Sequence, residues 1–276
     1  MRLWCRDIEY YAEVLSSSKG LPWILHLHGF MGSGRAFHNL SNRLKDRFNP
    51  VVLDLAGHGR SGGSEDPARY SLREQMDDIR SILERINFRP LVLHGYSMGG
   101  RLALHFANEY PDLVDAVVVE SSGSGIDDPA MRSHRQAKDE ERAVEIESGY
   151  DAFLERWLNK PLFRGPSLHS PEWEEYRRIM AGQNPAWMAA SLRGFGQGIM
   201  PSLIPKPGGR QTPLLLVAGE LDVRYRQILI TIEQKIPHSR FISIPEAGHR
   251  VHLDSPAVLA DAITIFTNHL KQNQMS

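Results

Sequence analysis

The 276-residue sequence contains a single cysteine, Cys5. One cysteine cannot form an internal disulfide, which favours a reducing compartment, and without an activating neighbour no catalytic role is expected for it. No stretch approaches the roughly 18 consecutive apolar residues of a membrane span. Residues 1–7 carry charges where a signal peptide needs an apolar segment. These absences predict a cytoplasmic protein that does not insert into a membrane.

The sequence also lacks an excess of charge, since its formal net charge is −1 at pH 7. A nucleic-acid partner is therefore not indicated. Its glycines do not have the spacing of a dinucleotide-binding fingerprint, so no nicotinamide site is expected. The length allows one large domain with an insertion or two small domains.

Short β-rich apolar runs alternate with helical patterns through the first 121 residues. One helical pattern begins at Ser71, with Glu74 three residues later as a capping box. The apolar runs are typical of strands buried on both faces of a parallel sheet, and they lie at residues 23–27, 51–53, 91–93 and 116–119. This alternation predicts a doubly wound, mostly parallel α/β sheet.

The alternation stops at Ser122 and returns only after about Gly209. A stretch of that length inside a compact domain is expected to be structured, so we predict a helical cap (lid) insertion over residues 122–209. Strand and helix patterns then resume at residues 214–218, 224–236 and 241–244, with a last helix from Pro256. The predicted core therefore comprises residues 1–121 and 210–276.

Residues 95–99 read Gly-Tyr-Ser-Met-Gly, directly after a predicted strand and before a helical pattern. This is the Gly-x-Ser-x-Gly pattern of the strand-to-helix turn that exposes the serine of α/β-hydrolases. We therefore predict an α/β-hydrolase fold with Ser97 as its reactive residue. A serine hydroxyl is a weak nucleophile and a weak base, and it needs an imidazole oriented by a carboxylate.

Both partners follow Ser97 in the expected chain order. Asp222 comes just after the predicted strand 214–218, and His249 just after the strand 241–244. Loops at the carboxyl ends of parallel strands are where such sheets bind ligands. Ser97, Asp222 and His249 are thus the predicted catalytic triad, with Glu220 as the rival acid.

Two backbone amides are predicted to form an oxyanion hole. The amide after the reactive serine belongs to Met98, and the loop after the first buried strand offers that of Phe30. Other polar residues are given structural roles. His26 and His28 occupy alternate strand positions with no carboxylate partner, so no metal site is expected. Asp54 ends a strand before a turn, and Glu120 is expected to be a network or solvent-facing group.

At this point the sequence resembles a known family, the 2-succinyl-6-hydroxy-2,4-cyclohexadiene-1-carboxylate synthases of menaquinone and phylloquinone biosynthesis. The resemblance extends from Pro22 to Phe266. It rests on residues 28–32, 54–59, 95–101, 189–194 and 247–253. The Tyr-Ser-x-Gly-Gly-Arg run at 96–101 and the Ser-Leu-Arg-Gly run at 191–194 are its discriminating parts.

The resemblance implies a cofactor-independent lyase that abstracts a proton α to a carbonyl and expels pyruvate. The triad serine would act as the base. The implied substrate, 2-succinyl-5-enolpyruvyl-6-hydroxy-3-cyclohexene-1-carboxylate, carries three carboxylates, and guanidinium groups bind carboxylates in bidentate fashion. Arg101 and Arg135 match anion-binding positions of the family, and Tyr96 and Trp157 match aromatic positions of its site.

One departure from the family is present in the predicted cap. The arginine that usually precedes the Asn-containing turn is missing from residues 179–184, although Arg177 and Arg178 lie just upstream. Either one of them reaches the site, or the third carboxylate is held differently. Ala56 also replaces a common proline, with no expected consequence.

Two alternatives stay open. A carboxylic-ester or C–C bond hydrolase would use Ser97 as a nucleophile, and a non-catalytic ligand receptor could share the fold. A dehalogenase or an epoxide hydrolase is excluded, because each needs a carboxylate at position 97. The expected partner is a small polycarboxylate, and the sequence leaves monomer and homodimer equally open.

Overall fold

The protein is described by a computed structural model that covers residues 1–203 and 211–275. Within these residues eight strands form one sheet in the order β1-β2-β4-β3-β5-β6-β7-β8. β1 and β2 are antiparallel, β2 is antiparallel to β4, and all other pairs are parallel. The strands are β1 (Arg2–Cys5), β2 (Ile8–Val14), β3 (Trp23–Leu27), β4 (Asn49–Asp54), β5 (Leu91–Tyr96), β6 (Ala116–Glu120), β7 (Leu214–Gly219) and β8 (Ser239–Ile244). The predicted, mostly parallel α/β sheet is confirmed.

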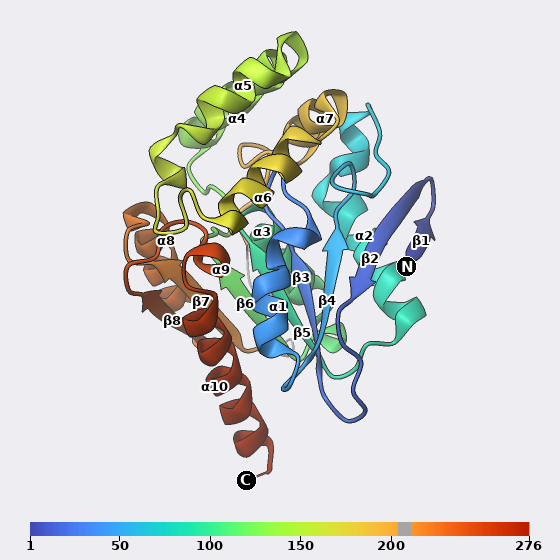
Figure 1. Cartoon of the computed structure of the whole chain (residues 1–276), viewed down its shortest axis with the longest axis vertical. Coiled ribbons are helices and arrows are strands. Elements are labelled where there is room, and N and C mark those ends of the chain that lie inside the picture. The colour runs from blue at the N-terminus through green and yellow to red at the C-terminus, as the bar shows by residue number, and fades with distance from the viewer. Residues whose placement is uncertain (204–210, 276) are drawn as a thin grey trace.

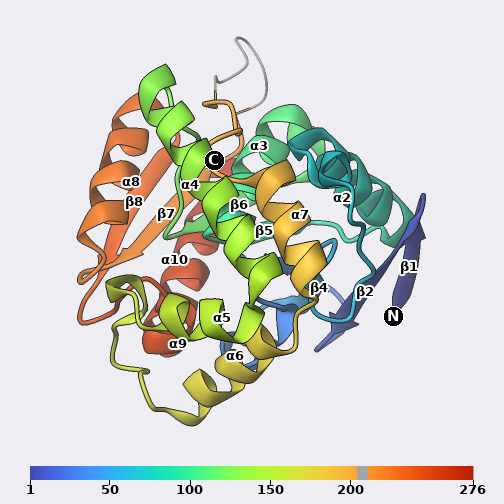
Figure 2. The ribbon, with the colours of Figure 1, turned by 90° about the horizontal axis from the view of Figure 1, so that it is seen from above.

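Each central strand is buried on both faces because helices cover both sides of the sheet (Figure 2). Successive side chains along a strand point to opposite faces. Leu25 and Leu27 of β3 accordingly join the cluster that contains α2, α3 and α8, whereas Ile24 joins the cluster that contains α1 and α10. The covering helices are α1 (His38–Leu44), α2 (Leu72–Ile86), α3 (Met98–Glu109), α8 (Val223–Lys235), α9 (Val251–Asp254) and α10 (Pro256–Met275).

The predicted start of α2 is confirmed, since the hydroxyl of Ser71 accepts a hydrogen bond from the amide of Glu74 at 3.3 Å. The hydroxyl thereby satisfies one of the amides that a helix leaves unpaired in its first turn.

Four helices lie above the carboxyl ends of the parallel strands, between β6 and β7 in the chain (Figure 1). They share a third apolar cluster that also includes Met31 and Leu253 from the core. These helices are α4 (Pro129–Ser148), α5 (Tyr150–Leu158), α6 (Pro171–Ala181) and α7 (Pro185–Phe195). They occupy the segment for which a cap was predicted. The predicted boundary at residues 209 and 210 lies outside the described residues.

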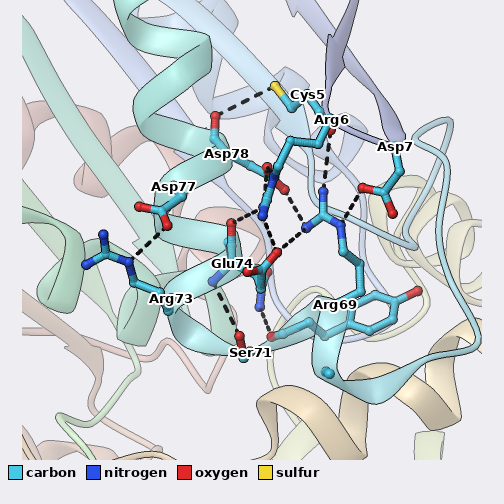
Figure 3. Close-up of polar contacts among 12 residues, drawn as sticks. Cys5, Arg6, Asp7, Arg69, Ser71, Arg73, Glu74, Asp77 and Asp78 are labelled. Atoms are coloured by element: carbon cyan, nitrogen blue, oxygen red, sulfur yellow. Dashed lines mark hydrogen bonds and ion pairs between the residues drawn. The ribbon is translucent and has the colours of Figure 1, made fainter.

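The β1-β2 hairpin, for which no strand was predicted, is fastened to α2 by an ion-pair network (Figure 3). Asp78 of α2 is 1% exposed and pairs with the guanidinium groups of Arg69 at 2.8 Å and Arg6 at 2.7 Å. It also accepts a hydrogen bond from the Tyr10 hydroxyl at 2.6 Å. A buried carboxylate needs such partners to remain ionised.

No helix among the described residues combines the length and the apolar character that crossing a membrane requires.

Candidate active site

Ser97 lies at a sharp turn between β5 and α3, with φ 51° and ψ −107°. A positive φ is costly for a residue with a side chain and is found where neighbouring structure enforces it. The turn leaves no room for larger residues, because a methyl group at Gly99 would clash with the carbonyl of Leu27. The Ser122 hydroxyl donates a hydrogen bond to the carbonyl of Ser97 at 2.6 Å. These contacts fix the backbone of Ser97 at the end of β5, where the residue borders a cavity.

Asp222 and His249 meet at the carboxyl ends of β7 and β8. The distance between Asp222 Oδ2 and His249 Nδ1 is 2.7 Å, and the two residues are 7% and 4% exposed. The rings of Tyr96 and Tyr225 flank the imidazole, with centroids 5.3 and 4.8 Å away. A carboxylate on Nδ1 orients the imidazole and leaves Nε2 available for the serine.

Glu220, the rival acid, lies elsewhere. Its side chain is exposed, and its Oε2 accepts a hydrogen bond from the amide of Glu246 at 3.1 Å. The contact with His249 therefore belongs to Asp222.

Phe30 and Met98, whose backbone amides were predicted to form an oxyanion hole, both border the cavity beside Ser97. Neither amide donates a hydrogen bond to another residue of the described chain. The loop that carries Phe30 packs tightly on the turn of Ser97, since a methyl group at Gly29 would lie 2.7 Å from the ring of Tyr96 and 3.5 Å from Ser97 Cβ. Two free amides beside the reactive hydroxyl are suited to stabilising an oxyanion.

The cavity next to Ser97 has a volume of about 320 Å³, and five cationic side chains line it without any Asp or Glu. Its cations come from α3, from the helices above the sheet and from α8. They are Arg101, Arg135, Arg142, Lys160 and Arg224. An excess of positive charge in a partly enclosed space attracts an anionic ligand.

Arg101 lies one turn after Ser97 on α3 and is 9% exposed. Its only side-chain hydrogen bond among the described residues runs from Nη2 to the carbonyl of Phe195, at 3.2 Å. Burial lowers the pKa of Arg101 to about 10, so the guanidinium remains charged at neutral pH.

Arg135 and Arg142 of α4 share one carboxylate. Asp139, which is 3% exposed, accepts from Arg135 Nε at 2.9 Å and from Arg142 Nη1 at 2.9 Å. Arg135 also donates to the side-chain oxygen of Gln197. The predicted Arg135 thus borders the cavity with part of its charge already balanced.

Lys160 and Arg224 have no carboxylate partner among the described residues. Lys160 follows α5, and its Nζ lies 3.9 Å from the ring centroid of Trp157, which also borders the cavity. No local sequence signal marks Arg142, Lys160 or Arg224 as site residues, because a cation in a polar stretch is most often a solvated surface group. Only the tertiary arrangement places them on one cavity.

Three residues considered in the sequence lie away from this cavity. The ring of Tyr96 is 3% exposed beneath the site, against His249 and His252, and is not among the lining residues. Arg177 and Arg178 are paired with Glu174 and Glu175 and border a separate outer hollow.

The remaining polar candidates hold the scaffold together. His28 Nε2 accepts from the amide of Leu55 at 2.9 Å, and His26 Nδ1 lies 2.8 Å from His94 Nδ1. Glu120 accepts from the imidazole of His252 at 2.7 Å. Burial raises the pKa of the Glu120 carboxyl, but electrostatic attraction and hydrogen bonds from His252 and His94 outweigh burial and lower this pKa. Within the part of the chain that is described, no group of His, Cys, Asp or Glu side chains could hold a metal ion.

Asp54 likewise organises a turn. Its Oδ1 accepts from the amide of Gly34 at 2.7 Å, and its Oδ2 accepts from the amide of Arg60 at 2.8 Å.

Comparison with known proteins gives consistent matches. The model of the alpha/beta hydrolase family matches residues 24–262. A Bacillus subtilis (strain 168) protein named putative 2-succinyl-6-hydroxy-2,4-cyclohexadiene-1-carboxylate synthase is 34% identical over 248 residues, covering 88% of this chain and 89% of its own length.

Among solved structures, MenH from S. aureus is 29% identical with a TM-score of 0.87, covering 95% of this chain and 98% of its own. A thermophilic esterase from Thermogutta terrifontis shares the fold at 24% identity and a TM-score of 0.80, covering 98% of this chain and 99% of its own. The resemblance predicted from the sequence is confirmed by these matches.

Proposed function

Because the chain belongs to the α/β-hydrolase family, and within it to the 2-succinyl-6-hydroxy-2,4-cyclohexadiene-1-carboxylate synthases, we propose that it eliminates pyruvate from 2-succinyl-5-enolpyruvyl-6-hydroxy-3-cyclohexene-1-carboxylate. The observation that carries this proposal is the cavity beside Ser97, lined by five cations and no acid. A trianionic substrate is costly to hold in a partly dehydrated site unless cations meet its carboxylates. A neutral ester would have no use for this charge.

Ser97 serves as the base in this reaction, with its own proton drawn off by His249. The serine oxygen takes the ring C2 proton, which is acidified by the adjacent succinyl carbonyl. The electron pair of the C2–H bond forms the C2–C3 double bond, the C3–C4 double bond moves to C4–C5, and the C5–O bond breaks. Enolpyruvate leaves and takes up the proton that His249 holds, which gives pyruvate and returns Ser97 and His249 to their starting states. No oxidant, reductant or cofactor is needed for this balance.

The remaining site residues support this step. The amides of Phe30 and Met98 stabilise the negative charge that develops on the succinyl carbonyl oxygen. Asp222 holds the His249 imidazole in the tautomer that accepts the serine proton. Arg101 and Arg135 bind substrate carboxylates, Trp157 borders the ring, and Tyr96 supports His249 from below.

We place this activity in the cytoplasm, in accord with the single, buried cysteine. The substrate is a small molecule, so no macromolecular partner is required.

The test is to supply the purified protein with the enolpyruvyl cyclohexene substrate and to measure pyruvate release. A panel of neutral aryl esters is assayed alongside. Rapid pyruvate release with weak ester hydrolysis supports the lyase. Efficient ester hydrolysis without pyruvate release would instead establish the alternative, an ester hydrolase with a nucleophilic Ser97.

A further inference from the structure

The cations of the cavity differ in how their charge is balanced. Arg135 and Arg142 share the carboxylate of Asp139. Arg101, Lys160 and Arg224 have no carboxylate partner among the described residues. Three cations are therefore available to a ligand, and two of them, Lys160 and Arg224, carry no assigned role in the proposed reaction.

Lys160 is held at the cavity wall by an aromatic platform. Its Nζ lies 3.9 Å from the ring centroid of Trp157, a distance at which the ring attracts a cation. Trp157 is in turn fixed by the ring of Phe30 at 6.1 Å and the ring of Phe153 at 5.6 Å. The ammonium is thus positioned before any ligand arrives, which lowers the entropic cost of using it.

Lys160 also lies where two spaces meet. It borders the cavity of Ser97 and an outer hollow of about 810 Å³ between α5 and α6. A cation at this junction faces both the reactive serine and the solvent side of the helices above the sheet.

We propose that Lys160 is a substrate-binding residue, and that its ammonium pairs with a carboxylate of the substrate at the side of the cavity formed by Trp157. This inference rests on the proposed function, which supplies a substrate with several carboxylates. Lys160 would then bind the substrate carboxylates together with Arg101 and Arg135.

The surroundings of Lys160 make its charge sensitive to pH. Burial, followed by the repulsion of Arg142, lowers the pKa of Lys160 to about 8. From α4 and α5 the charged groups that act on it are Arg135, Arg142, Glu145 and Arg156. Across the cavity lie Arg224 and Tyr225 of α8.

The outer hollow adds further charged groups near Lys160. Its acids are Asp151, Glu155 and Glu174. Its basic groups are Arg164, His169, Arg177 and Arg178. A lysine with a lowered pKa is charged below that pKa and neutral above it, so carboxylate binding weakens as the pH rises through about 8.

The experiment compares Lys160→Met and Lys160→Arg with the wild type in the pyruvate-release assay. Lys138→Met is the matched control, since Lys138 is an exposed lysine of α4 outside the cavity. Lys160→Met is expected to raise KM about 10- to 150-fold with a small change in kcat, as for the loss of a charge-assisted pair. Lys160→Arg restores most of this affinity, and Lys138→Met behaves as the wild type.

A pH series compares the wild type with Lys160→Arg, so that titrations common to both enzymes cancel and the titration of Lys160 remains. The ratio of kcat/KM for the wild type to that for Lys160→Arg is measured between pH 7 and pH 9, with the uncatalysed rate subtracted at each pH. The ratio is expected to fall by about tenfold, because only the lysine loses its charge around a pKa of about 8.

The outcomes separate the two proposals. If the wild type releases pyruvate while Lys160→Met keeps the wild-type KM, or if the ratio stays constant with pH, Lys160 does not bind the substrate and the proposed function stands. If the wild type releases no pyruvate, the proposed function fails and this inference fails with it.

Discussion

A single contact distinguishes the two candidate acids of the predicted triad. Asp222 Oδ2 lies 2.7 Å from His249 Nδ1. Glu220, two residues earlier, is exposed and accepts a hydrogen bond from the amide of Glu246. Glu220 and Asp222 are only two residues apart in the loop after β7, yet their side chains contact different residues. Local sequence offered both carboxylates, and only the loop conformation after β7 separates them.

Replacing each triad residue tests this assignment. Ser97→Ala, His249→Ala and Asp222→Asn are each expected to lower kcat by orders of magnitude, and their combination is expected to be far from additive, because the three groups act as one unit. Glu220→Gln is the matched control, with near wild-type turnover. If Asp222→Asn were active and Glu220→Gln inactive in steady-state kinetics, the acid would be misassigned.

Arg101 offers a test of anion binding next to the serine. Arg101→Ala is expected to lower kcat/KM by roughly 10- to 150-fold, because a buried guanidinium that pairs with a carboxylate contributes ~1.5–3 kcal/mol. Arg101→Lys should recover only part of this loss, since an ammonium lacks the planar fork. Kinetics at two ionic strengths, with circular dichroism to confirm folding, provide the measurement.

The control for this series is Arg85→Ala, which changes an exposed arginine of α2 outside the cavity. Wild-type kinetics are expected for it. An Arg101→Ala enzyme indistinguishable from this control would argue against a polyanionic substrate.

Residues with a motif were predictable, and residues without one were not. Ser97, Asp222 and His249 could be predicted as a triad because a tight turn and two strand ends constrain the local sequence. Lys160 and Arg224 have no such sequence motif. Their positions on the cavity wall depend on how distant parts of the chain pack together. From the sequence alone, a cation in a polar stretch is predicted to be a surface charge. Only the tertiary structure shows that it borders a cavity.

Among the helices and strands, the network between the β1-β2 hairpin and α2 is the part most open to a stability test. Asp78 is 1% exposed and meets Arg69, which is 8% exposed, and Arg6. Asp78→Ala leaves Arg69 without its buried partner and is expected to lower the free energy of unfolding by roughly 3–5 kcal/mol. Denaturant titration measures the change, and the catalytic constants per folded enzyme should be retained.

The matched control lies on the same helix. Glu84→Ala removes an exposed pair between Glu84 and Arg80 at 3.0 Å, and solvent screening makes such a pair nearly neutral for stability. Equal stability losses in Asp78→Ala and Glu84→Ala would show that burial does not strengthen the network. Arg6 is unsuitable as a control for these variants, although its side chain is largely exposed, because it belongs to this network.

The parallel strands were predictable because burial on both faces leaves continuous apolar runs. The antiparallel β1-β2 hairpin was missed although β2 carries a signal, with Ile8, Tyr10 and Ala12 buried at every second position. That alternation is typical of a strand with one covered face. The polar residues between them obscured it when only continuous runs were sought.

Considered over the entire chain, the loop of His249 joins the sheet to the helices above it. Arg250, next to His249, is 1% exposed and donates from Nη2 to the carbonyl of Phe163 at 2.6 Å. Its guanidinium lies 3.9 Å from the ring centroid of Trp173 on α6. The predicted cap and the loop of His249 are thus in direct contact, an arrangement that periodicity in the sequence could not reveal.

The role of Ser97 distinguishes elimination from hydrolysis in the same fold. A serine base exchanges only a proton with the substrate, whereas a serine nucleophile forms a covalent intermediate. The decisive measurement is intact-protein mass after rapid quenching of the enzyme during turnover. We predict the unmodified mass at every time while pyruvate accumulates. A substrate-derived mass increment on Ser97, absent from Ser97→Ala, would contradict the elimination mechanism.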